Sequence, residues 1–144
     1  GAILWEGYDS YYEHHAPSTF SYWGVLEYNT ESKTYHPRKH FYTLSQFTRF
    51  IAPGSVRIGV DASAKELMIT AFRDEQGQIA IIGLNPHDKD IVIDGSLKDI
   101  PGAKRFQYYY TNNAENLQRG ADIKSGKGFK ATIPANTIFT LKSY

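Results

Sequence analysis

The sequence predicts a mainly β protein: an antiparallel β-sandwich with Greek-key-like connections, preceded by a strand, a loop and one helix. Residues 54–144 contain seven short runs in which apolar and polar side chains alternate, separated by turns rich in Gly, Pro, Asn and Asp. Residues 36–51 instead repeat apolar side chains at helical spacing. We therefore expect two domains, 1–53 and 54–144.

The N-terminal part begins with a short apolar run, residues 2–5, that fits a buried strand. Residues 6–33 are irregular and rich in turn and loop markers. Within and beside this segment, residues 22–29 are compatible with a short extended piece.

The predicted helix covers residues 36–51. Phe41 and Leu44 lie on one stripe together with aromatic or apolar residues of the next two turns. Pro37 suits the first helical turn, and Pro53-Gly54 ends the helix.

The predicted sandwich strands are 55–61, 66–73, 78–85, 90–95, 105–111, 128–134 and 137–143. In the first of them, Val56, Ile58 and Val60 alternate with Arg57 and are expected to point inward. Residues 74–77, "DEQG", predict a hairpin turn in which Gly77 supplies a positive φ.

The run "QYYYTN", residues 107–112, places an aromatic row in the sandwich. Because side chains alternate along a strand, Tyr108 and Tyr110 share one face and Tyr109 takes the other. An exposed pair would form a platform for a sugar ring. The alternative, which we favour, is that one face packs on the core or on the helix.

Composition limits the function classes. The 144 residues carry 16 basic and 15 acidic side chains, a net charge of +1 with no basic stripe, so we expect no nucleic-acid partner. No apolar run has the roughly 18 residues that a membrane span needs. The absence of Cys excludes disulfides and thiolate metal sites. The unusual figure is 15% aromatic residues, 11 of them Tyr, which suits sheet surfaces and sugar rings alike.

The five histidines invite a metal hypothesis. His36 and His40 have the i, i+4 spacing of two helical ligands. However, His36 is expected to precede the helix, and no carboxylate spacing completes a site. We therefore expect neither a metal nor another cofactor.

Two blocks resemble a known family. The blocks are "WEGYDSYYEHH" and "TYHPRKHFYTLSQFTRFIAPGSVRIG", and residues 35–59 carry most of the weight. They resemble the C-terminal portion of glycoside hydrolase family 30, especially its endo-β-1,6-galactanase branch. The resemblance implies a (β/α)8 barrel with a β-sandwich on its side. Residues 2–9 would then be the eighth barrel strand, 38–51 the eighth helix and 55–144 most of the sandwich.

The resemblance also implies partners and a location. The rest of the catalytic barrel would lie upstream, and a strand from the mature N-terminus would join the sandwich. The parent would be a secreted or periplasmic retaining enzyme that hydrolyses a galactan-like, β-linked polysaccharide.

The catalytic groups are expected to be missing from this chain. Retaining glycosidases use two carboxylates roughly 5–5.5 Å apart. In the family these lie on barrel strands four and seven, the acid/base following an Asn, and the sequence contains no Asn-Glu pair. We expect the chain alone to be inactive.

Sugar contact is the better functional expectation for the N-terminal segment. In the family a Trp at the end of strand eight forms the floor of the sugar subsite, and Trp5 matches it. Glu6, Tyr8, Asp9 and His14 would offer further groups to sugar hydroxyls. The alternative is that Trp5 and Tyr8 are barrel-core aromatics and the other residues belong to a loop.

Two other function classes remain open. The sandwich could be an autonomous carbohydrate-binding module, which needs exposed aromatic side chains. It could instead be a structural module whose apolar face docks on a barrel, which predicts an exposed apolar patch or self-association when the barrel is absent.

Overall fold

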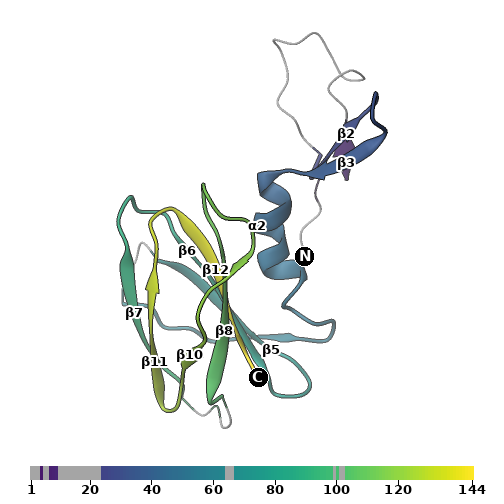
Figure 1. Ribbon diagram of the computed structural model, residues 1–144. Helices are drawn as coiled ribbons and strands as arrows, with labels where there is room; N and C mark the ends of the chain where they lie inside the picture. The colour runs from purple at the N-terminus through teal and green to yellow at the C-terminus, as the bar shows by residue number, and fades with distance from the viewer. Residues whose placement is uncertain (1–3, 5–6, 10–23, 64–66, 99, 101–102) are drawn as a thin grey trace. The chain divides into compact units, whose positions relative to one another are not determined.

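The computed structural model describes residues 4, 7–9, 24–63, 67–98, 100 and 103–144. The chain divides into two compact units, residues 1–44 and 45–144 (Figure 1). The described residues form twelve strands and one helix, and the prediction of a mainly β, antiparallel protein is confirmed. None of the helical segments in this part of the chain has the length and apolar character of a membrane span.

The first unit contains a three-stranded sheet in the order β1 (Tyr8–Asp9), β2 (Leu26–Asn29) and β3 (Thr34–Pro37). Strand β1 is parallel to β2, and β2 is antiparallel to β3. The turn between β2 and β3 is held by Asn29 Oδ1, which accepts the backbone N–H groups of Glu31 and Ser32 at 3.0 and 2.9 Å. The extended piece expected at 22–29 is thus present over 26–29.

Helix α2 spans Lys39–Thr48 and is shorter than predicted. The assignment of Pro37 to the first helical turn is wrong, because Pro37 is the last residue of β3 and pairs with Leu26. At the other end, Ile51 N–H still donates to Phe47 O, and Gly54 follows with a φ of 83°. The predicted end of the helix at Pro53-Gly54 is therefore only a few residues late.

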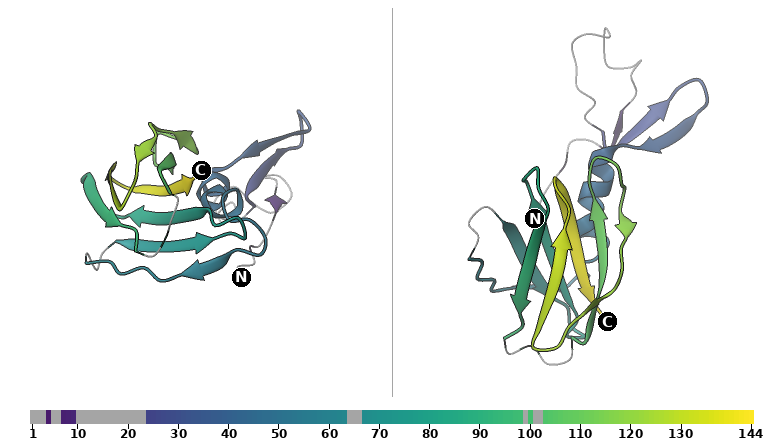
Figure 2. Two further views of the ribbon diagram at one scale, coloured as in Figure 1. Left: turned by 90° about the horizontal axis from the view of Figure 1, so that it is seen from below. Right: turned by 60° about the vertical axis from the view of Figure 1, so that its left-hand side comes forward.

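The second unit contains nine strands in two sheets (Figures 1 and 2). They are β4 (Val56–Ile58), β5 (Met68–Arg73), β6 (Ile79–Asn85), β7 (Ile91–Ser96), β8 (Arg105–Thr111), β9 (Gln118–Arg119), β10 (Ile123–Lys124), β11 (Gly128–Ile133) and β12 (Thr137–Ser143). The larger sheet has the order β10-β8-β12-β6-β5-β4 with β9 also on β8, and the smaller pairs β11 with β7. All seven predicted strands are present.

The core lies between these two sheets. Its centre is formed by Phe106, Ile133, Phe139 and Leu141, which are completely buried. The chain passes from the large sheet to the small one after β6 and after β10, and returns before β8 and before β12. Because both sheets supply alternate residues to one interior, burial of apolar surface joins segments that are far apart in the sequence.

Two aromatic rings of the core lie over glycines on the neighbouring strand. Phe139 is in register with Gly83, and a Cβ on that glycine would lie 2.5 Å from the ring. Phe129 is in register with Gly95 in the smaller sheet, where a Cβ would also lie 2.5 Å from the ring. A larger residue at either glycine would have to displace the ring.

Predictions for individual side chains are confirmed in part. Gly77 has a φ of 80° in the β5–β6 turn, as expected. Val56 was expected to point into the core but is 55% exposed, because it begins β4, the edge strand of its sheet. Leu4 belongs to the run expected to form a buried strand, yet it lies outside any strand. Its side chain is 54% exposed, because no described segment covers it.

The last turn of α2 is joined to the large sheet by a buried amide. Gln46 is fully buried, and its Nε2 donates to Thr111 Oγ1 at 3.1 Å on β8. Thr140 Oγ1 on β12 lies 2.7 Å from Gln46 Oε1 and 2.9 Å from Gln46 O. Burial of an amide costs free energy unless it is hydrogen-bonded, and both of its polar atoms are satisfied here.

A second polar contact closes the β5–β6 hairpin against the end of β12. Lys142 Nζ lies 2.9 Å from Asp74 Oδ2, and Asp74 Oδ1 accepts Gln78 N–H at 2.8 Å. Burial by itself would raise the pKa of Asp74. The hydrogen bonds from Lys142 and Gln78 and the charge of Lys142 outweigh burial and hold this pKa below its ordinary value.

We predict that Gln46→Leu lowers the free energy of unfolding by about 1–3 kcal/mol, because it removes the two buried hydrogen bonds that the side-chain amide forms with Thr111 and Thr140. Chemical denaturation of the two proteins measures the difference. The exposed Gln76 provides the matched control, and Gln76→Leu should change stability by less than about 0.5 kcal/mol. Equal effects of the two substitutions would contradict the anchoring role of Gln46.

The Asp74–Lys142 pair predicts a pH dependence. Because the folded-state pKa of Asp74 lies below its unfolded value, the pair stabilises fully above the unfolded pKa and its contribution is lost as pH falls through the folded pKa. Asp74→Asn should therefore be less stable than the wild type at pH 7, with a difference that shrinks below about pH 5. Thermal unfolding across pH 2–7 measures it.

The control for this prediction is a pair on the surface of the small sheet. Lys130 Nζ lies 3.0 Å from Asp94 Oδ2, with both side chains mostly exposed. Exposed pairs contribute little, so Asp94→Asn should follow the wild-type pH profile closely. If the stability difference between Asp94→Asn and the wild type shrank at low pH as much as that of Asp74→Asn, the assignment of the pH dependence to the buried pair would be contradicted.

Candidate functional site

The structure describes part of the predicted sugar-contacting segment. Tyr8 and the backbone of Asp9 form β1, whereas Trp5, Glu6 and His14 lie outside the described residues. The prediction that these five residues act together therefore stays a prediction.

Tyr8 lies in a group of three tyrosines on the three-stranded sheet. Its ring meets that of Tyr35 edge to face at a centroid distance of 5.4 Å and that of Tyr28 at 6.2 Å. The Tyr28 and Tyr35 rings are 4.9 Å apart. Tyr8 and Tyr35 are each 52% exposed, so the three rings, called the tyrosine surface below, offer aromatic area to solvent.

Strand register explains why these rings meet. Tyr28 is opposite Tyr35 in the β2–β3 hairpin, and Tyr8 is opposite Leu26, two residues before Tyr28. Since side chains two apart share a face, the three rings gather on one side of the sheet. The alternation in "LEYN" and "TYHP" carries this signal, but both runs are too short for sequence analysis to have identified Tyr28 and Tyr35.

The intervening positions of the hairpin are polar. Glu27 is opposite His36, and Asp9 is in register with Glu27 along the backbone. His36 Nε2 lies 3.0 Å from Thr34 Oγ1. The β2–β3 hairpin therefore has one aromatic face and one polar face.

The base of the hairpin is fixed to the start of α2. Gly24 O accepts hydrogen bonds from His40 Nε2 at 2.7 Å and from Arg38 Nη1 at 3.1 Å. His36 and His40 thus contact different partners. Across residues 4, 7–9, 24–63, 67–98, 100 and 103–144, no three His, Asp or Glu side chains gather as metal ligands would.

The row of tyrosines on β8 is divided between two faces, as the alternation predicts. Tyr108 is buried in the core, where its ring stacks on Tyr110 at 5.3 Å and burial raises its pKa. Tyr109 faces the other side and packs against Phe50 at 4.6 Å. The idea of an exposed Tyr108–Tyr110 platform is wrong, because these two rings complete the core.

Comparison with known proteins gives a family match over the sandwich. Residues 54–141 match the model described as "Glycosyl hydrolase family 30 beta sandwich domain". The glucuronoxylanase XynC of Bacillus subtilis is 25% identical over 104 residues, which are 71% of this chain and 24% of that protein. The chain thus spans about a quarter of the length of the curated relatives it matches.

Solved structures share the fold. A family 30 endoxylanase from Clostridium papyrosolvens C71 is 24% identical with a TM-score of 0.71, covering 81% of this chain and 30% of that one. The catalytic domain of xylanase C from Talaromyces cellulolyticus is 20% identical with a TM-score of 0.74, covering 96% and 29%. A conserved exported protein from Bacteroides fragilis is 20% identical with a TM-score of 0.66, covering 83% and 26%.

Proposed function

Because the chain belongs to glycoside hydrolase family 30 and carries the β-sandwich domain of that family, we propose that it is the C-terminal portion of a polysaccharide-degrading enzyme. In this proposal residues 1–53 close a (β/α)8 barrel with its last strand and helix, and residues 54–144 are the side domain. The strand, hairpin and helix that precede the family match at residue 54 support this division.

The chain contributes substrate contacts and not the chemistry. Retaining hydrolysis needs an acid/base and a nucleophile, and the sequence contains no Asn-Glu pair of the kind that the family resemblance implies for the acid/base. We assign Trp5, Glu6, Tyr8, Asp9 and His14 to the sugar-binding cleft of the intact enzyme. The observation that carries this assignment is the exposed tyrosine surface around Tyr8, since aromatic rings pack on the apolar faces of sugars and leave the hydroxyls to polar neighbours.

The substrate class is a β-linked polysaccharide. Resemblance of the N-terminal blocks favours a galactan, whereas the relatives XynC and the Clostridium and Talaromyces enzymes are xylanases by name. The parent enzyme would be secreted or periplasmic, an assignment supported by the exported protein among the similar structures. Its partners would be the polysaccharide and the remainder of the barrel.

We predict that the chain binds oligosaccharides without cleaving them. Titration with β-1,6-linked galacto-oligosaccharides, with xylo-oligosaccharides as comparison, should give a saturable change in tryptophan fluorescence with one of the two sugars. Trp5→Ala should abolish most of this change. Tyr35→Ala should weaken binding roughly two- to tenfold, the effect of one lost aromatic contact, as measured by calorimetry.

The matched control is Phe47→Ala, which removes an exposed aromatic ring that belongs to α2 and not to the tyrosine surface. It should leave the affinity unchanged. Binding that is insensitive to Tyr35→Ala would contradict the tyrosine surface as a subsite, and the release of reducing ends by the purified chain would contradict its catalytic inactivity.

A further inference from the structure

A second polar and aromatic cluster lies on the outer face of the large sheet, the face turned away from the sandwich core. Tyr109 on β8 is half-buried, with its ring against Phe50. The guanidinium of Arg49 lies 5.9 Å from the centroid of each of these two rings. The rings thereby position an exposed positive charge at the end of the helix that precedes the sandwich.

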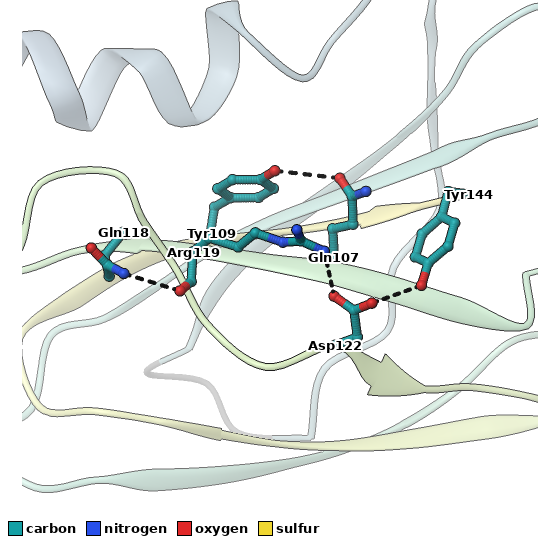
Figure 3. Close-up of polar contacts among 6 residues, drawn as sticks. All are labelled: Gln107, Tyr109, Gln118, Arg119, Asp122 and Tyr144. Atoms are coloured by element: carbon teal, nitrogen blue, oxygen red, sulfur yellow. Dashed lines mark hydrogen bonds and ion pairs between the residues drawn. The ribbon is translucent and has the colours of Figure 1, made fainter.

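The neighbouring charges are already paired with one another. Arg119, in register with Tyr109, lies with its Nη2 2.9 Å from Asp122 Oδ1, and Tyr144 Oη donates to Asp122 Oδ2 at 2.7 Å (Figure 3). The hydrogen bonds from Tyr144 and Arg119 hold the pKa of Asp122 below its ordinary value. Asp122 therefore stays ionised, and its charge balances that of Arg119.

Arg49 is left without such a partner. In the part of the chain that the structure describes, its guanidinium forms no ion pair, and Arg105 adds another positive charge near Asp122. Beside it, Tyr109 Oη is 3.4 Å from Gln107 Oε1, a contact that leaves the Gln107 amide N–H groups without a partner among the described residues (Figure 3). The cluster therefore combines an unbalanced positive charge, an aromatic edge and free amide donors.

We propose that the cluster formed by Arg49, Gln107 and Tyr109 is a binding site on the sandwich for an acidic sugar unit, a uronic acid of a polysaccharide. The Arg49 guanidinium supplies the planar pair of N–H donors that a carboxylate accepts, while Gln107 and Tyr109 supply groups for the ring hydroxyls. The choice of a polysaccharide as the ligand rests on the proposed function. The site uses none of the residues of the tyrosine surface.

The test is an NMR titration of the whole chain with a xylo-oligosaccharide that carries one glucuronic acid substituent, against the same oligosaccharide without it. The acidic ligand should shift the amide signals of residues 107, 109 and 119 in a saturable way. The neutral ligand should leave them unchanged. Signals of the tyrosine surface report separately on the proposed function, so failure of one site is distinguishable from failure of the other.

Arg49→Gln should weaken binding of the acidic ligand at this site about tenfold or more, because it removes a charge-assisted contact. Arg57→Gln is the matched control, since Arg57 is also exposed but lies on β4, at the other end of the same sheet. Both variants should melt at the wild-type temperature. Unchanged affinity of Arg49→Gln, equal binding of the neutral ligand, or equal binding of a single-stranded oligonucleotide would each overturn the proposal.

Discussion

The second unit depends on one interaction, the hydrogen bonding of the Gln46 side chain between the end of α2 and the large sheet. Its amide reaches a threonine on β8 and another on β12, the two strands that are neighbours at this point of the sheet. An amide in that position is tolerated only when the helix end, both strands and their register are all correct. This polar contact therefore selects one arrangement of apolar elements that could otherwise slide on one another.

The large sheet is covered on both faces, by the core on one side and by the end of α2 with Phe50 on the other. Strand β6 is buried along nearly its whole length, because Ile79 and Ile81 face the core while Ala80 and Ile82 face the side on which Gln46 and Phe50 lie. A strand buried on both faces leaves little freedom for polar or reactive groups. The groups available for ligands accordingly lie elsewhere. One set is the tyrosine surface on the three-stranded sheet of the first unit, and the other is at the β8 side of the sandwich, where β9 and β10 are only two residues long.

Sequence analysis predicted the sandwich well because its strands carry the simplest signal, alternation over six or seven residues. It failed where an element was too short for any period, as in β3, β9 and β10. It also assigned Pro37 to the helix, because a proline just before a helical run suits both a first helical turn and the end of a strand.

Long-range contacts of single side chains could not be predicted. For α2, sequence analysis identified the apolar stripe, but the buried residues of this helix are Ser45 and Gln46. No periodicity reveals a polar side chain whose partners are 65 and 94 residues away. The tyrosine surface could not be predicted for the same reason, because the register of β1, β2 and β3 must be known before Tyr8, Tyr28 and Tyr35 can be placed together. Of the predicted sugar contacts, Tyr8 is the one whose side chain the structure describes.

The glycine and phenylalanine pairs of the core have a consequence for how such sequences change over time. Each ring occupies the space where its partner's side chain would begin, so the two positions share one volume. A methyl group gained at Gly83 would require a smaller residue at Phe139 in the same step, and Gly95 and Phe129 are bound by the same condition. Across diverged sequences of this domain, these positions should therefore co-vary as pairs, and libraries that randomise one member alone should return the glycine.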